Sequence, residues 1–306
     1  MQDARFDVVG LGNAIVDVLA HTNDAFLAQH GMAKGAMTLI EAERALEIYH
    51  LMEGCVECSG GSAANTMVGL ASLGGSSVYV GKVRDDRLGE LFRQDIRAAG
   101  VTFDTPSATD GPPTGRSLVL VTPDAQRTMN TFLGASATLG PDDVDAAMIE
   151  AARITYLEGY LWDPEPAKQA FLKAAQIAHK AGRKVALSLS DPFCVERHRA
   201  EFRDLVAGHV DLLLANETEV ISLYETAGFD GALEQLRENC EVAAVTRGAQ
   251  GSVVVSGKEL VRVEAEPVEF VVDTTGAGDL FAGGFLLGIS RGLDLEICGR
   301  DRKSVV

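Results

Sequence analysis

Strand-like and helix-like segments alternate along the second half of this 306-residue chain, and this alternation constrains the fold more than any other feature. Runs of β-type apolar residues occupy 154–159, 184–190, 209–215 and 242–248, and a helical pattern covers 166–181 between the first two. Strands that alternate with helices predict a mostly parallel sheet covered by helices on both faces. Ligands bind at the carboxyl ends of such strands. The length allows one large α/β domain or two smaller ones.

Residues 100–134 break this alternation. Three strand patterns lie there with turns but no helices between them: 101–103, 116–121 and 127–132. Parallel strands need long crossovers, so these three do not fit a βαβ sheet. We expect them to form a small antiparallel sheet with the segments near 14–22 and 34–39. Such a sheet can fold over a ligand and exclude water.

The first strand pattern, 6–12, ends in a glycine turn that resembles the start of a dinucleotide-binding fingerprint. Ile15 stands where that fingerprint needs its third glycine, and the alternating run 13–20 continues as a strand. Asn13 and Asp17 then have equal parity and face the same side. A carboxylate there suits a bidentate bond to vicinal sugar hydroxyls. The alternative is a surface strand with incidental polar residues.

A glycine-rich turn precedes the last long helical pattern. Gly276, Ala277 and Gly278 carry small side chains, so an anion can approach their amides at the helix N-terminus. Asp279, in the first helical turn, can accept a proton from a hydroxyl that attacks phosphorus. The helix dipole would lower its basicity, so we expect an orienting partner that takes the proton late. The alternative is an ordinary glycine turn that caps a helix.

Two strings together resemble the signatures of the ribokinase-like (PfkB) family of sugar and nucleoside kinases. One is Asp-Thr-Thr-Gly-Ala-Gly-Asp at 273–279 with Phe-Ala-Gly-Gly-Phe at 281–285, and the other is Ser-Gly-Gly-Ser-Ala-Ala-Asn-Thr at 59–66. The resemblance fails only at the extreme C-terminus. It implies a three-layer αβα sandwich over residues 1–300, with a mostly parallel central sheet and a small antiparallel β lid. The lid would comprise about 14–22, 34–39 and 100–134.

The resemblance also implies which residues bind the acceptor. Asn13 and Asp17 match a Gly-Asn-x-x-x-Asp element that binds ribose in the adenosine-kinase branch. Gly61 allows close backbone approach, Ser62 begins a helix, and Asn65 lies one turn later. These three would contact a sugar hydroxyl, although Ser62 could serve as a helix cap alone.

The nucleotide side is implied by further matches. Asn216 and Glu219 match the family's Asn-x-x-Glu element, in which Glu219 would act on Mg²⁺ through water. A helix capping box would use the same two residue types. Thr246, Gly248 and Thr275 would contact the nucleotide. Arg127 could place charge near the phosphates or be an exposed lid arginine.

The implied reaction is ATP-dependent phosphorylation of a primary hydroxyl of a nucleoside or sugar. Adenosine is the favoured acceptor, through Asp279-assisted in-line transfer with Gly276, Ala277 and Gly278 as the anion hole. Ribokinase, fructokinase and ketodeoxygluconate kinase activities are the alternatives within the family. A non-catalytic nucleoside-binding protein on the same fold is the alternative from another class. ATP and Mg²⁺ are the expected cofactors, and the use of K⁺ stays open.

Composition narrows the partners. A net charge of −17 argues against nucleic acid or an anionic membrane surface as the main partner. The N-terminal residues lack a signal-peptide pattern, and no apolar run is long enough to span a bilayer. Five cysteines suggest reduced thiols and a cytoplasmic location, and the Cys55/Cys58 pair lacks the second pair that a zinc site needs. We expect a monomer or homodimer that binds small molecules.

The charged run 301–306 stops a helical pattern that begins at 295–300. These six residues can be encoded by a sequence resembling a common sequencing-library adapter. We therefore expect this tail to be non-native and a C-terminal helix to be missing.

Overall fold

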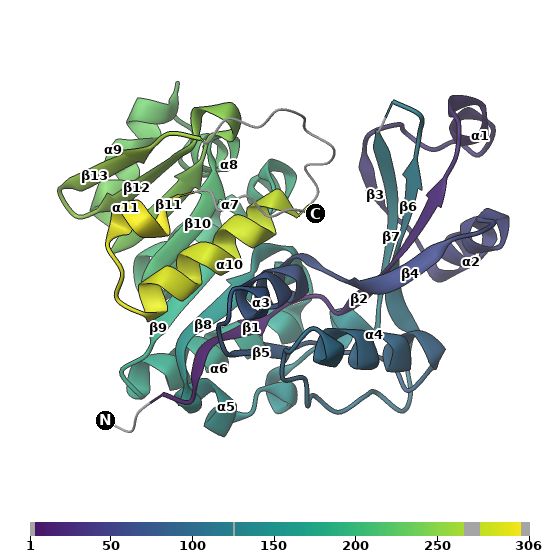
Figure 1. The fold of residues 1–306 in the computed structure, drawn as a ribbon, viewed down its shortest axis with the longest axis horizontal. Helices are drawn as coiled ribbons and strands as arrows, with labels where there is room; N and C mark the ends of the chain where they lie inside the picture. Colours follow the sequence, from purple (N-terminus) through teal and green to yellow (C-terminus); the bar gives the residue numbers. More distant parts are fainter. Residues whose placement is uncertain (1–3, 125, 266–275, 301–306) are drawn as a thin grey trace.

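The computed structural model describes residues 4–124, 126–265 and 276–300. Within these residues an eight-stranded main sheet runs in the order β13-β12-β11-β10-β9-β8-β1-β5 (Figure 1). Neighbouring strands from β11 through β10, β9, β8 and β1 to β5 pair in parallel. Strands β12 and β13 continue the sheet antiparallel from β11. The bounds are β1 (Phe6–Leu11), β5 (Ser77–Val80), β8 (Ala152–Glu158), β9 (Lys184–Ser188), β10 (Leu212–Asn216), β11 (Val242–Thr246), β12 (Ser252–Ser256) and β13 (Glu259–Val263).

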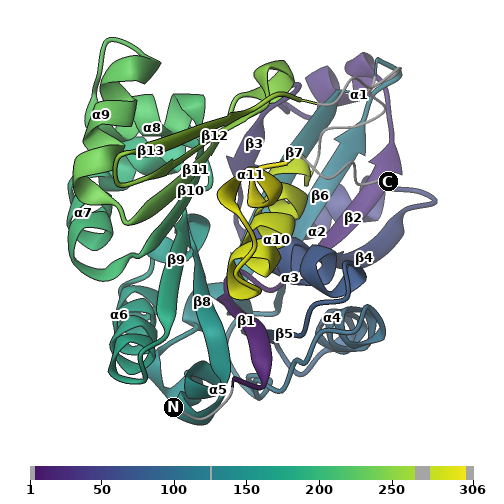
Figure 2. The ribbon, with the colours of Figure 1, turned by 60° about the vertical axis from the view of Figure 1, so that its left-hand side comes forward.

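Helices cover both faces of the main sheet, because its strands are apolar on both sides. Val185 and Leu187 of β9 pack into one core, whereas Ala186 between them packs into the other. The first core is closed by α5 (Ala146–Ala151), α6 (Glu165–Lys180), α7 (Pro192–His209), α8 (Glu217–Tyr224) and α9 (Phe229–Asn239). The second is closed by α3 (Ser62–Ser72), α10 (Ala277–Ser290) and α11 (Leu295–Cys298), and α3 and α10 lie side by side (Figure 2).

A second sheet stands beside the main sheet (Figure 1), in the order β3-β7-β6-β2-β4. Two of its pairs are antiparallel, β2 with β4 and β6 with β7, and two are parallel, β2 with β6 and β3 with β7. Its strands are β2 (Ile15–His21), β3 (Met37–Leu39), β4 (Val56–Gly60), β6 (Thr114–Val121) and β7 (Arg127–Gly134). Helices α1 (Asp24–Gln29) and α2 (Ala42–Leu51) lie on its side away from the main sheet, and α4 (Arg87–Ala98) packs against β4.

The expected fold class is confirmed, with three corrections to its details. Residues 101–103 were wrongly assigned to the smaller sheet, because Thr102 bridges Val78 of β5 in parallel at the main sheet. Strand β4 was missed, because its sequence was interpreted only as a cysteine pair leading into a glycine motif. Asn13 was placed on a strand but lies in the connection between β1 and β2.

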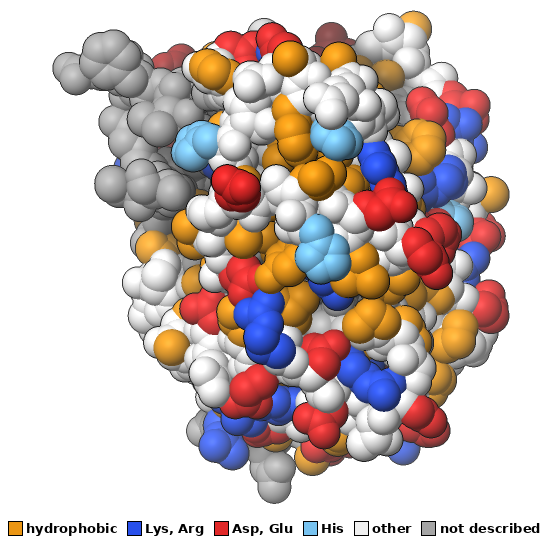
Figure 3. Space-filling view, turned by 90° about the vertical axis from the view of Figure 1, so that its right-hand side faces the viewer, with side chains coloured by type: hydrophobic (Ala, Val, Ile, Leu, Met, Phe, Trp, Pro, Cys, Tyr) orange, Lys and Arg blue, Asp and Glu red, His pale blue; other side chains and the backbone are white. Residues whose placement is uncertain are grey.

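The outer face of the second sheet carries mixed side chains. In Figure 3 acidic, basic and apolar groups are interspersed over this side of the molecule. Leu46 and Leu51 of α2 and Val56 of β4 are exposed large apolar side chains, whereas the exposed Met37 and Leu39 of β3 line a cavity on the inner face of the second sheet. Four short 3-10 helices complete the described elements: η1 (Ala135–Thr138), η2 (Pro141–Asp143), η3 (Gly159–Trp162) and η4 (Gly248–Gln250). The tail 301–306, with the expectation that it is non-native, lies outside the described residues.

Candidate active site

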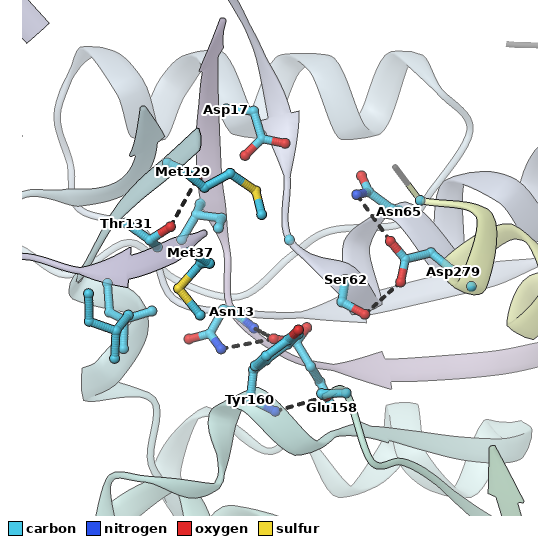
Figure 4. A pocket seen from close by; sticks show the side chains of 18 of the residues that line it. Asn13, Asp17, Met37, Ser62, Asn65, Met129, Thr131, Glu158, Tyr160 and Asp279 are labelled. Carbon is cyan, nitrogen blue, oxygen red and sulfur yellow. Dashed lines mark hydrogen bonds between the residues drawn. The ribbon is translucent and has the colours of Figure 1, made fainter. Parts of the chain in front are cut away.

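Asp279 lies at the start of α10, where two side chains from α3 hold its carboxylate (Figure 4). Ser62 Oγ donates to Oδ1 at 2.7 Å, and Asn65 Nδ2 donates to Oδ2 at 3.4 Å. Ser62 begins α3 and Asn65 lies one turn later, so both reach the same carboxylate. The N-terminal signature therefore orients the acid of the C-terminal signature, which the sequence had not linked by contact.

Burial raises the pKa of Asp279 to about 6, and the hydrogen bonds from Ser62 and Asn65 lower it only in part. The expectation that the helix N-terminus makes this carboxylate less basic is therefore wrong in its net direction, because burial outweighs the lowering effects. A carboxylate with this pKa is a better proton acceptor than an ordinary aspartate. It is still largely ionised at neutral pH.

The turn before Asp279 leaves room for an anion. Gly276 caps α10 with φ 73°, a left-handed conformation that favours glycine. A Cβ added to Gly278 would meet no atom within 4 Å, so its backbone faces open space. The N–H groups of the first helical turn have no partner within the helix. Gly276, Ala277 and Gly278 thus form the expected candidate anion hole beside the acid.

Asp17 lies on β2, and its carboxylate lies over the Gly60 backbone. A Cβ at Gly60 would be 2.4 Å from the Asp17 carboxyl carbon, and one at Gly61 would be 2.1 Å from the Asn13 carbonyl oxygen. The two glycines are therefore required by contacts within the protein itself. Burial raises the pKa of Asp17 to about 7; Arg127 lowers it and Asp279 raises it further.

Glu158, at the carboxyl end of β8, was missed by the sequence analysis. Its Oε1 accepts from Asn13 Nδ2 at 2.8 Å and from Asn13 N at 3.3 Å, and its Oε2 accepts from Ala63 N at 2.8 Å. Burial raises the pKa of this carboxyl to about 7, while the bonds from Ala63 and Asn13 lower it. Its place as an acidic residue at the end of a buried strand could have marked Glu158 as a candidate site residue.

A hydrogen-bond network around Glu158 joins three places where the chain passes between the two sheets. Asn13 connects β1 to β2, Ala63 lies in the first turn of α3 after β4, and Ser136 lies in η1 after β7. Ser136 Oγ lies 2.9 Å from Asn13 Oδ1 and can donate to it. The buried carboxylate of Glu158 therefore ties two crossings together directly, and a third, at Ser136, through Asn13. Asn13 is a member of this network, and it also lines the cavity beside Asp17.

Asn216 and Glu219 form a helix capping box at the start of α8. This was one of the two interpretations of their sequence motif, the other being a magnesium-orienting role. Asn216 Oδ1 accepts from Glu219 N, and Glu219 Oε2 accepts from Asn216 N, both at 2.9 Å. Burial raises the pKa of Glu219 to about 7. Both residues also line a cavity of about 150 Å³ with Gly278 and Asp279, so the capping role and a ligand role are compatible. Among the described residues no cluster of three or more His, Cys, Asp or Glu could hold a metal.

Three cavities meet at Gly278. The largest, about 410 Å³, reaches from Gly278 and Asp279 to the second sheet. The cavity lined by Asn216 and Glu219 adjoins it. A third, about 140 Å³, lies between Gly278 and the end of β11, where Thr246 and Gly248 line it. The residues predicted to bind the acceptor line the largest of these three cavities, and those predicted to bind the nucleotide line the other two. Thr275 lies outside the described residues.

The cavity of about 410 Å³ has apolar walls that the sequence analysis did not predict. They come mainly from the second sheet: Ile15, Met37, Leu39, Met129 and Leu133. In Figure 4 the side chains of Met37 and Met129 lie around the end of the cavity away from Asp279. No short motif marks these residues, because they come from three strands that only the folded sheet brings together.

Residues 36–301 match the pfkB family carbohydrate kinase. The chain belongs to this family. The crystal structure of adenosine kinase from Sinorhizobium meliloti is 54% identical, with a TM-score of 0.91, and the match covers 97% of this chain and 91% of that one. The structure of a probable sugar kinase protein from Rhizobium etli CFN 42 is 50% identical, with a TM-score of 0.91 and coverages of 97% and 90%. The adenosine kinase of Saccharomyces cerevisiae is 29% identical over 94% of this chain and 90% of its own length.

As a member of the pfkB family, the protein is a phosphotransferase. ATP is the phosphoryl donor, and a nucleoside or sugar is the class of acceptor. No helix in the described part of the chain is long and apolar enough to cross a membrane.

Proposed function

We propose that this protein phosphorylates the primary hydroxyl of adenosine, with ATP as the donor. The observation that carries this proposal is the cavity of about 410 Å³ that combines Asp279 at one end with apolar walls at the other. Its volume lies within the range of about 300–1,000 Å³ of small-molecule sites. The resemblance to adenosine kinases from Sinorhizobium meliloti and Saccharomyces cerevisiae supports the same acceptor.

The apolar walls favour a nucleoside over a free sugar. A sugar presents hydroxyl groups on all sides, and each would lose water against Met37, Met129 or Leu39 without gaining a hydrogen bond. A nucleobase presents flat, weakly polar faces, and thioether sulfur makes favourable contacts with aromatic rings. The two methionines therefore suit the faces of a base.

The order of groups along the cavity matches the order of groups in a nucleoside. In Figure 4 Asp279 lies at one end, Asp17 lies in the middle, and Met37, Met129 and Thr131 lie at the other end. A nucleoside whose primary hydroxyl lies at Asp279 would present its ribose hydroxyls to Asp17. Its base would then lie between the methionines.

Asp279 is the proposed proton acceptor. Its raised pKa suits this role, and Ser62 and Asn65 hold the carboxylate in place as the hydroxyl attacks. The amides of the Gly276–Gly278 turn would stabilise the charge of the transferred phosphoryl group. Asp17 would position the acceptor through the ribose hydroxyls.

The donor would lie across Gly278 from the acceptor. Thr246, Gly248 and the open backbone of Gly278 fit a nucleotide phosphate, since the small side chains leave the backbone accessible. Glu219 would orient water on Mg²⁺ and not bind the ion directly, because both of its oxygens already accept hydrogen bonds from Asn216. The metal neutralises phosphate charge when it is bound.

The second sheet would act as a lid. It supplies the apolar walls, and the tie through Glu158 connects it to the main sheet at the crossings. Closure over the acceptor would exclude water, which would otherwise compete for the phosphoryl group. The residues proposed for the lid are the five strands of the second sheet, so 101–103 is no longer among them.

Turnover with ATP tests the proposal. We expect kcat/KM for adenosine to exceed the values for ribose, fructose and ketodeoxygluconate by at least about 100-fold, because a base buries apolar surface that no free sugar offers. A higher kcat/KM for one of the sugars would make the protein a sugar kinase, as the 50% identical probable sugar kinase suggests. Binding of adenosine without turnover would favour the non-catalytic alternative.

A further inference from the structure

A row of polar side chains crosses the inner face of the second sheet. Asp17 of β2 lies directly opposite Ser117 of β6, and Ser117 lies directly opposite Thr131 of β7. On the other side of Thr131, the apolar Leu39 of β3 lies directly opposite it. Residues directly opposite each other point to the same face of a sheet. All four line the cavity of about 410 Å³ that is proposed to bind the acceptor, called the acceptor cavity below.

Apolar side chains border this row along the strands. Met129 and Leu133 lie two residues to either side of Thr131 on β7, so they share its face. Ile15 lies two residues before Asp17 on β2. The row is therefore a narrow polar strip in an otherwise apolar wall, and a ligand on this wall finds its hydrogen-bonding groups only along the strip.

Ser117 and Thr131 form a buried pair of hydroxyls. The two side-chain oxygens are 2.9 Å apart, and the residues are 3% and 7% exposed. Each hydroxyl has one proton and two lone pairs. One proton joins the two oxygens, so the pair keeps a second proton to donate and lone pairs to accept. Buried hydroxyls of this kind are costly unless a partner uses them.

The spacing of the row suits a nucleoside. Neighbouring strands lie about 4.8 Å apart, so Ser117 is one spacing and Thr131 two spacings from Asp17. If the ribose hydroxyls bind at Asp17, the base extends along the row toward the hydroxyl pair. The base edge then meets a donor and an acceptor, while its faces meet the methionines.

We propose that the Ser117–Thr131 hydroxyl pair hydrogen-bonds a ring nitrogen of the base and makes the enzyme specific for it. This inference rests on the proposed function, because it takes a nucleoside as the acceptor. It concerns the edge of the base, whereas the apolar walls contact only its faces.

Deaza analogues test the inference, because each replaces one ring nitrogen by a carbon and keeps the shape of the base. The probes are adenosine and its 1-deaza, 3-deaza and 7-deaza analogues, and the measurement is kcat/KM. The wild-type enzyme should use one analogue about 5- to 100-fold less efficiently than adenosine, since a buried hydroxyl then loses its partner. Ser117→Ala and Thr131→Val should reduce this difference to about threefold or less, mainly by losing activity on adenosine.

Thr38→Val is the matched control, because Thr38 is an exposed threonine on the other face of β3. It should keep the wild-type pattern. The inference is overturned if the wild-type enzyme treats all three analogues like adenosine. It is also overturned if the Ser117 and Thr131 variants slow all four nucleosides by one common factor, because that result indicates a structural role. Failure of the wild-type enzyme to phosphorylate adenosine at all would instead overturn the proposed function.

Discussion

The two sheets of this protein differ in what their faces contact. In the main sheet both faces pack on helices, and successive residues such as Val185, Ala186 and Leu187 are all fully buried. In the second sheet one face packs on α1 and α2, whereas the other lines the acceptor cavity and carries the Asp17–Ser117–Thr131 row. In the proposed function the main sheet therefore serves as the support, and the second sheet, which has one face not covered by helices, would recognise the acceptor.

The largest effect on turnover should come from Asp279, at the start of α10, which packs on the main sheet. Asp279→Asn should lower kcat by about 10²–10⁴, because the acceptor hydroxyl loses its proton acceptor, and should leave ATP affinity within a few-fold. Steady-state kinetics and ATP titration measure the two effects. Asp294→Asn, an exposed aspartate at the N-terminus of α11, is the control. Near-native turnover of the Asp279 variant would remove it from the mechanism.

The junction between the sheets should depend on Glu158. Glu158→Ala removes the acceptor of three N–H bonds and should lower the free energy of unfolding by about 2–4 kcal/mol. Glu296→Ala is the comparison, because the ion pair between Glu296 of α11 and Arg300 joins two exposed side chains. That loss should be only about 0–1 kcal/mol. Equal losses in urea unfolding would contradict the assignment of Glu158 as the tie between the sheets.

Asp17→Ala should affect the acceptor and not the donor. A lost charge-assisted bond is worth about 1.5–3 kcal/mol, which corresponds to a rise of about 10- to 150-fold in KM for the acceptor. KM for ATP should change by less than about threefold, since Asp17 lies on the second sheet. A rise confined to ATP would mean that the acceptor and donor sides have been interchanged.

The pH dependence should separate activity from stability. Burial raises the pKa of Asp17 to about 7 and that of Asp279 to about 6, so kcat/KM should fall as the pH drops through this range and both become protonated. The folded protein binds these protons more tightly than the unfolded chain does. The same protonation therefore stabilises the fold as the pH falls from about 7 toward the ordinary carboxyl range. A loss of folded structure that parallels the loss of activity would contradict this account.

The sequence predicted the main sheet better than the second sheet for a physical reason. Runs such as 154–159 and 242–248 can be recognised from the local sequence, because burial on both faces makes most residues of the strand apolar. Strand β4 was missed because Val56, Cys58 and Gly60 form no clear alternation. Residues 101–103 look like a strand by composition, but only the register beside β5 shows which sheet they join.

The candidate site could be predicted where it depends on short motifs. Asp279, Asn65 and Asn216 lie in contiguous strings, and the structure brings them together around Gly278 as the motifs implied. Glu158 could have been found from its place at the end of a strand. The pairing of Ser117 with Thr131 could not, because it depends on the register between β6 and β7.

Hydrogen exchange in the presence of single ligands tests most directly whether the second sheet binds the acceptor and the main sheet, with α10, binds the nucleotide. Adenosine alone should slow amide exchange in β2, β6 and β7 of the second sheet, and it should leave β10 and β11 of the main sheet nearly unchanged. A non-hydrolysable ATP analogue alone should protect the start of α10 and the end of β11 and leave the second sheet as it was. Protection of the second sheet by the ATP analogue, with none from adenosine, would contradict the account.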